Sequence, residues 1–197
     1  MNRLVKNPII YDFIQFIFGK PKMDRILLSE IRKLNLSSNA KILDLGGGTG
    51  FHRDLFPKTM QYVCLDSDLS KLEVSSKRNL DDDTVQGNAT QIPFEAKSYD
   101  LVLLTGVTHH VSDQALPGLL SEAQRVLQSK GHLVLFDPVY SRKNPLGSLF
   151  LKLDLGKFGR GRDQLYNILV EKFFPTQTID FTMIHTYLVF VGTSKGE

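Results

Sequence analysis

The sequence predicts an α/β fold with a doubly wound, mostly parallel sheet of seven strands, in which the C-terminal strand is antiparallel. Three observations support this prediction. Strand-like and helix-like runs alternate between residues 40 and 138. The run YDLVLLTG at 99–106 is continuously apolar, as expected of a strand that is buried on both faces. Two β-rich runs, TQTIDFTMI and TYLVFVGTS, end the chain with only His185 between them and predict an antiparallel pair that closes the sheet.

The individual elements follow from local patterns. Apolar residues at helical spacing predict a helical cap within residues 1–39, namely Ile9, Ile10, Phe13, Ile14 and Ile17. Strands are expected at 40–46, 61–66, 84–89, 99–106 and 131–138. Helices are expected in DLSKLEVSSKRN, where Asp68 is a suitable N-cap, and in QALPGLLSEAQRVLQ at 114–128. One domain then contains a ligand-binding core (40–138), a helical insert (139–175) and a β-hairpin (176–197).

Length, charge and cysteine content limit the class of protein. With 197 residues and a formal charge of +3, the chain fits one globular domain, and its composition does not indicate nucleic-acid binding. The single cysteine, Cys64, excludes an intramolecular disulfide and gives no metal-ligand set, so we expect a cytoplasmic location and no metal site. No apolar run is long enough to span a membrane, although the N-terminal helix leaves a contact with a membrane surface open.

A glycine-rich loop, LDLGGGTGFH at 43–52, follows the first predicted strand. Open α/β sheets bind ligands at this edge, where the strands end. The dinucleotide spacing G-x-G-x-x-G fails here, because Phe51 or Arg53 stands where the third glycine is required. No Gly-Lys-Ser/Thr follows, so a phosphate-binding P-loop is also excluded. The spacing present is D-x-G-x-G-x-G, which places a carboxylate beside the loop and suits a ligand that carries an ammonium group.

Five further motifs accompany this loop. They are the acid Asp66 at the end of the second strand, GNATQIPF (87–94), YDLV (99–102), THHV (108–111) and EAQRVLQSKG (122–131). In order and spacing, the six motifs resemble those of the class I S-adenosylmethionine-dependent methyltransferases of small molecules. The resemblance implies a Rossmann-like sheet, S-adenosylmethionine as cofactor and S-adenosylhomocysteine as product. The chain lacks the Asn/Asp-Pro-Pro-Tyr motif of enzymes that methylate DNA amino groups and has TGVTHH in its place, which disfavours nucleic acid as substrate.

The resemblance also implies which residues bind the cofactor. The loop would receive the methionine moiety, and the carboxylate of Asp66 would accept hydrogen bonds from both ribose hydroxyls. Asn88 stands where the family usually has an aspartate, but an amide can still recognise the adenine edge. The full set of expected cofactor residues is Asp44, Gly46, Gly48, Gly50, Asp66, Ser67, Asn88, Ala89 and Thr105.

Methyl transfer from a sulfonium requires little acid–base chemistry, because the leaving group is neutral. A general base is needed only when the acceptor atom carries a proton. His109 and His110 follow the fourth strand, and His110 matches the second histidine of the family motif, so these two are the candidate catalytic residues. The alternative for both is a packing role or a contact with the cofactor. His52 is expected on the surface of the glycine loop.

The insert after the fifth strand is more basic than the rest of the chain, with seven basic and three acidic side chains between residues 140 and 172. One interpretation is a solvated helix pair. The other is a lid over an acidic or amphipathic acceptor, in which Arg160 and Arg162 bind the acceptor and Tyr11 of the N-terminal helix reaches it from the opposite side. A second functional hypothesis is a scaffold that binds the cofactor and transfers no methyl group.

Overall fold

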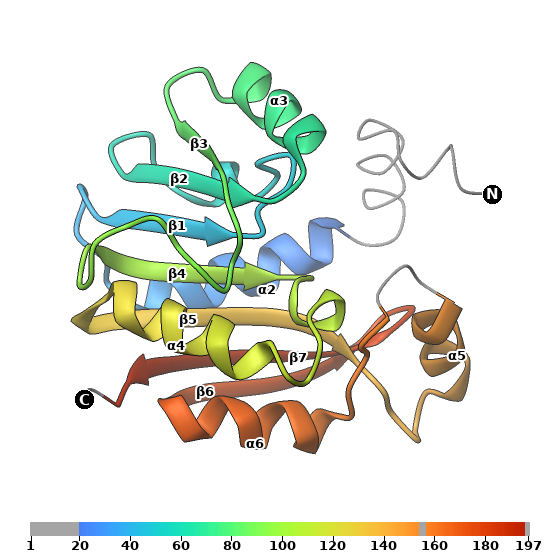
Figure 1. Ribbon diagram of the computed structural model, residues 1–197. Coiled ribbons are helices and arrows are strands. Elements are labelled where there is room, and N and C mark those ends of the chain that lie inside the picture. Colours follow the sequence, from blue (N-terminus) through green and yellow to red (C-terminus); the bar gives the residue numbers. More distant parts are fainter. Residues whose placement is uncertain (1–19, 154–156, 196–197) are drawn as a thin grey trace.

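In the computed structural model, which describes residues 20–153 and 157–195, seven strands form one sheet (Figure 1). Their order in the sheet is β3-β2-β1-β4-β5-β7-β6. The strands are β1 (Lys41–Leu45), β2 (Gln61–Asp66), β3 (Asp83–Gln86), β4 (Tyr99–Thr105), β5 (Leu127–Val139), β6 (Phe173–Thr182) and β7 (Thr186–Ser194). Strands β1 to β5 pair in parallel, whereas β7 is antiparallel to both of its neighbours. The predicted fold class is confirmed.

Helices cover both faces of the sheet. On one face lie α4 (Leu116–Val126) and α6 (Arg162–Lys172), and on the other lie α2 (Lys20–Lys33), α3 (Leu69–Arg78) and the short helix η1 (Arg53–Leu55). The central strands supply side chains alternately to the two cores. In β5, for example, Leu133 and Leu135 pack under α4, while Val134 and Phe136 pack on the other face. The sheet is therefore buried on both faces, as its continuous apolar runs predict.

Three boundaries differ from the prediction. Helix α4 ends at Val126, and β5 begins at Leu127, because Leu127 pairs with Tyr99 across a register shift in β4. Strand β3 ends at Gln86, since Asn88 forms a turn in which its side chain accepts from Thr90 N (2.9 Å). Strand β6 begins at Phe173, so it includes residues expected at the end of the insert.

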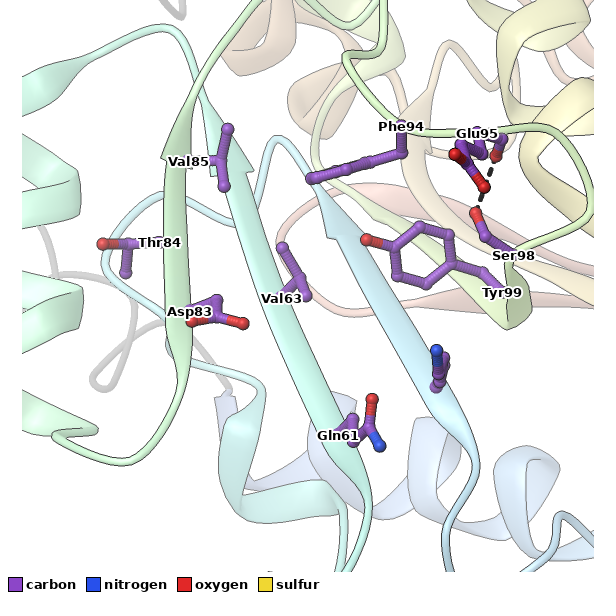
Figure 2. Close-up of a pocket in the computed structure, with 10 residues that line it drawn as sticks. Gln61, Val63, Asp83, Thr84, Val85, Phe94, Glu95, Ser98 and Tyr99 are labelled. Atoms are coloured by element: carbon purple, nitrogen blue, oxygen red, sulfur yellow. Dashed lines mark hydrogen bonds between the residues drawn. The ribbon is translucent and has the colours of Figure 1, made fainter.

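No helix lies between β3 and β4, a segment that the structure describes completely. A loop crosses the sheet face there and leaves a cavity of about 370 Å³ (Figure 2). Val63, Val85, Phe94 and Tyr99 form its apolar part. Because the first residues of β1, β2 and β3 also line it, the cavity lies over the amino ends of these strands, opposite the edge that carries the glycine loop.

The insert contains α5 (Pro145–Leu153) and α6, and α5 lies beyond the carboxyl ends of the parallel strands (Figure 1). Residues 1–19, with Tyr11 and the apolar positions of the predicted cap, lie outside the described residues. Helix α2 occupies 20–33. Within the described ranges, none of the helices combines the length and the apolar character that crossing a membrane requires.

A buried arginine fixes the chain that follows the glycine loop. Arg53 has an exposed fraction of 2%, and its Nε donates to Asp82 Oδ2 at 2.6 Å. Its two terminal nitrogens donate to the carbonyls of Phe56, Pro57 and Met60. One guanidinium thus joins η1, the approach to β2 and the turn before β3.

We expect Arg53→Met to lower the free energy of unfolding by about 3–5 kcal/mol, because it leaves the Asp82 carboxylate buried without its cation. Urea denaturation measures this change. The exposed Arg142 is the control, and Arg142→Met should change the free energy by less than about 0.5 kcal/mol. Equal stability of the two variants would show that the Arg53 network contributes nothing.

Candidate functional site

The glycine loop has a shape that other residues cannot adopt without strain. Gly46, Gly48 and Gly50 have φ angles of +78°, +56° and +67°. A Cβ at Gly46 would lie 2.6 Å from Val107 Cγ2, and one at Gly50 would overlap Ser75. At Gly48, by contrast, the nearest atoms to such a Cβ are 3.6 Å away or farther. The first and third glycines are thus needed for packing, and the second leaves the backbone accessible to a ligand.

Asp44, in β1 before the loop, is fully buried. Its Oδ2 accepts the hydroxyl of Tyr62, whose pKa is raised by burial and by this carboxylate, so Tyr62 remains a donor. Its Oδ1 is buried and has no hydrogen-bond partner among the described residues. A buried carboxylate oxygen in this condition fits a ligand with a cationic donor, such as the ammonium group of S-adenosylmethionine.

Asp66, the last residue of β2, holds the loop from the neighbouring strand. Its Oδ2 accepts from Gly48 N and its Oδ1 from Asp68 N, both at 2.9 Å. A carboxylate has four lone-pair sites, so each oxygen can still accept a hydroxyl. Ser67 beside it is exposed. The side chain expected to bind the ribose therefore also sets the position of the second glycine.

The residues after β3 form a compact turn. Asn88 is exposed, and its Oδ1 accepts from both the backbone N and the Oγ1 of Thr90 at 2.9 Å. Ala89 is half-buried. An aspartate would accept the same two hydrogen bonds, so the amide at this position does not alter the shape of the turn.

The sequence analysis predicts His52 on the surface of the glycine loop, and the structure shows that this prediction is wrong. The exposed fraction of His52 is 7%, and its Nδ1 lies 3.1 Å from Thr105 Oγ1 and 3.7 Å from Asp44 Oδ2. Its Nε2 is buried without a partner in the described part of the chain. His52 thus links the end of β4 to the carboxylate of β1 and adds a second orphaned polar atom at the site.

Cys64 lies behind the same loop. It is 1% exposed, its Sγ is 3.7 Å from Gly48 O, and burial raises the pKa of its thiol. A Cβ at Gly47 would approach this sulfur to 2.8 Å. Its role is therefore to pack against the loop.

A buried histidine–carboxylate pair follows β4. In the short helix η2 (Thr108–His110), His109 is 6% exposed and its Nδ1 lies 2.7 Å from Asp137 Oδ1. Asp137 is fully buried at the end of β5, and its Oδ2 accepts from Val107 N and Thr108 N. The carboxylate requires a hydrogen on Nδ1, which makes Nε2 the basic nitrogen of the neutral ring.

The two histidines of the motif differ in environment. His110 is exposed, and its ring centroid is 4.0 Å from that of His109. Sequence reasoning ranked His110 first and did not identify Asp137. The available signal was an acid in the apolar run GHLVLFDP, at the edge of the sheet where the other site residues end.

Arg160 has a different role from the one expected. It is 3% exposed, and its guanidinium donates to Asp113 Oδ1, Thr108 O and Val111 O, each at 2.7 Å. The prediction that it binds an acceptor is therefore corrected: its donors are directed at the loop after β4. Arg162 is partly exposed and pairs with Asp180 and Asp163, each at 3.2 Å.

The described residues thus bring together most of the predicted site at one edge of the sheet. The strands β1, β2 and β4 deliver Asp44, Asp66 and Thr105, and the loops that follow β1 and β4 deliver the glycines and histidines. Tyr11 is not among the described residues, and no metal-binding group of three or more His, Cys, Asp or Glu occurs in the described ranges.

Residues 43–135 match the family model described as "Methyltransferase domain". The chain is 32% identical over 133 residues to the demethylmenaquinone methyltransferase of Thermotoga maritima, covering 64% of this chain and 56% of that protein. It is 28% identical over 140 residues to the glycine/sarcosine/dimethylglycine N-methyltransferase of Actinopolyspora halophila, covering 64% of this chain and 24% of that protein. The chain therefore spans about half, or less, of the length of these relatives.

A solved structure of geranyl diphosphate methyltransferase in complex with S-adenosylmethionine shares the fold. It superposes with a TM-score of 0.72 over 88% of this chain and 84% of that chain, at 12% sequence identity.

We expect Arg160→Ala to lower the thermal midpoint and to cost about 2 kcal/mol of stability, because two backbone carbonyls lose a buried charged donor. Arg162→Ala, which removes a partly exposed pair, should cost less than about 1 kcal/mol. Differential scanning calorimetry compares the two. Unchanged stability of Arg160→Ala, with a raised KM for an acidic acceptor, would restore Arg160 as a ligand of the acceptor.

Proposed function

We propose that this chain is a class I S-adenosylmethionine-dependent methyltransferase that transfers the methyl group of the cofactor to a small-molecule acceptor. The match of residues 43–135 to the methyltransferase family model supports this proposal. The observation that carries the proposal is the edge formed by the glycine loop, Asp44 and Asp66, in which a buried carboxylate oxygen has no partner within the described residues. The family match favours an enzyme over a scaffold that only binds the cofactor.

Each residue at this edge would contact a different part of the cofactor. Gly48 would allow its methionine portion to approach the backbone, with Asp44 near the ammonium group. Asp66 would accept the ribose hydroxyls, and the turn at Asn88 and Ala89 would contact the adenine. When bound, S-adenosylmethionine supplies an electrophilic methyl group on a sulfonium with a neutral leaving group.

His109 would remove the proton of the acceptor atom. Asp137 holds the ring by Nδ1, so that Nε2 accepts the proton and the carboxylate stabilises the resulting imidazolium. Asp137 acts through His109 and is a positioning residue. In this proposal the acceptor atom carries a proton in its resting state, as an hydroxyl, an acidic carbon or an ammonium does.

An amphipathic acceptor fits the site better than a purely acidic one. Arg160 and Arg162, the two arginines that could bind an acidic group of the acceptor, each pair with a carboxylate of the protein. The relatives named above act on demethylmenaquinone and on glycine derivatives, so family membership alone does not select a substrate. We also propose a cytoplasmic location, on the basis of the single, buried, free Cys64.

The direct test is incubation of the chain with methyl-labelled S-adenosylmethionine and fractionated metabolite extracts. Transfer of label to an extractable small molecule, and its loss in a Gly48→Val variant, is the expected result. Binding of S-adenosylmethionine without transfer to any fraction would favour the scaffold.

We expect Asp66→Ala to weaken S-adenosylhomocysteine binding by about 2–4 kcal/mol, because two charge-assisted hydrogen bonds to the ribose are lost and Gly48 N loses its acceptor. Isothermal titration calorimetry measures the dissociation constant. The exposed acid Asp81 supplies the control, and Asp81→Ala should bind as the unaltered chain does. A dissociation constant for Asp66→Ala within twofold of the control would remove Asp66 from the site.

We expect His109→Gln to reduce kcat by about 100-fold or more for an acceptor that carries a proton, because the base is absent. The dependence of kcat/KM on pH should also disappear. Asp137→Asn should give a smaller loss of kcat, with the same KM for S-adenosylmethionine. If His110→Gln lowers kcat as His109→Gln should, while His109→Gln changes only stability, the exposed histidine is the base.

A further inference from the structure

Helix α5 presents an apolar face to solvent. Leu146, Leu149 and Phe150 have exposed fractions of 68%, 51% and 53%, and their spacing places them on one side of the helix. Phe158, which follows the helix in the insert, is 39% exposed. We call Leu146, Leu149 and Phe150 the α5 face. Single exposed apolar residues need no explanation, but three on one helical face indicate a contact surface.

The opposite side of α5 is fastened to the protein, so this exposure belongs to a fixed helix. Leu151 is fully buried. Asn144 Oδ1 accepts from Gly147 N, and Asn144 Nδ2 donates to Ile184 O, both at 3.0 Å. The ring Nδ1 of His185 lies 3.0 Å from Gly147 O. The turn between β6 and β7 therefore holds the start of α5 with its apolar face outward.

Basic side chains flank the α5 face. Arg142 and Lys143 precede the helix, and Lys152 and Lys157 lie at its end and beyond it, and all four are exposed. From residue 139 to residue 157 the sequence contains these four cations and one acid, Asp154. An apolar helical face bordered by cations is the arrangement of helices that lie in the interface of an anionic bilayer.

We propose that the α5 face docks on the surface of a membrane that contains anionic lipids. Leu146, Leu149 and Phe150 enter the boundary between head groups and acyl chains, and the four cations contact lipid phosphates. A symmetric contact between two copies of the chain fits less well. It would place the Arg142, Lys143 and Lys152 side chains of both copies close together, with one acid against four cations per copy between residues 139 and 157.

The position of this surface gives it a functional meaning. Helix α5 lies at the same edge of the sheet as the glycine loop (Figure 1). Phe158 N donates to the backbone carbonyl of His109 at 3.0 Å, so the segment after α5 is bonded to the residue proposed as the base. An amphipathic acceptor dissolved in the bilayer would then be presented next to the site. This consequence rests on the proposed function, whereas the docking itself does not.

The test is sedimentation of the full chain with vesicles, without any assay of activity. Vesicles of phosphatidylglycerol mixed with phosphatidylcholine should bind the chain about tenfold or more tightly than pure phosphatidylcholine vesicles, and added salt should release it. The variant Leu149→Glu/Phe150→Glu should lose about tenfold or more of this binding. Replacing Arg142, Lys143 and Lys152 by Gln should remove the preference for the anionic vesicles while the fold is retained.

The chain offers a matched control at the opposite edge of the sheet. Leu80, between α3 and β3, and Phe174, near the start of β6, are exposed by 84% and 56%. The variant Leu80→Glu/Phe174→Glu changes charge and apolarity equally and should bind vesicles as the unaltered chain does. Equal loss in both double variants, or no binding to the mixed vesicles, overturns the proposal. So does a dimer in light scattering that Leu149→Glu/Phe150→Glu dissociates. S-adenosylhomocysteine binding by the variants tests the proposed function separately.

Discussion

The carboxylate of Asp137 is the interaction on which the proposed reaction centre depends. Fully buried at the end of β5, it accepts three N–H groups, from Val107, Thr108 and the His109 ring. These bonds fix the loop after β4 in a compact turn. The insert then builds on that turn, because Phe158 and Arg160 bond to its carbonyls. Without Asp137 the loop after β4 would lose the three hydrogen bonds that fix it, and the insert would lose the fixed carbonyls to which it bonds.

The same device recurs along this edge of the sheet. Asp66 at the end of β2 holds the loop after β1, just as Asp137 at the end of β5 holds the loop after β4. In each case an acid on one strand accepts a backbone N–H from the loop of its neighbour. A buried carboxylate is costly unless it is hydrogen-bonded, so these loops have one low-energy arrangement. The two loops are therefore organised before a ligand arrives.

Local sequence patterns were sufficient for the sheet and for the shape of the glycine loop. Apolar runs locate the strands, and the positions of Gly46, Gly48 and Gly50 predict backbone conformations that the structure shows. The details that the patterns missed depend on contacts between distant segments. Arg160 looks like a free cation in sequence, but its carboxylate partner, Asp113, lies 47 positions earlier. The sequence predicts His52 on the surface of the glycine loop, whereas in the structure its ring lies beside Thr105 and Asp44.

The packing of Cys64 against the glycine loop has a practical consequence. The sulfur is buried behind Gly47 and Gly48, and a thiol with a raised pKa reacts slowly with alkylating reagents. Reagent can reach it only when the loop separates from β2. Because the chain has one cysteine, the rate at which Cys64 is alkylated reports how often the loop opens. Mass spectrometry measures this rate without any introduced label.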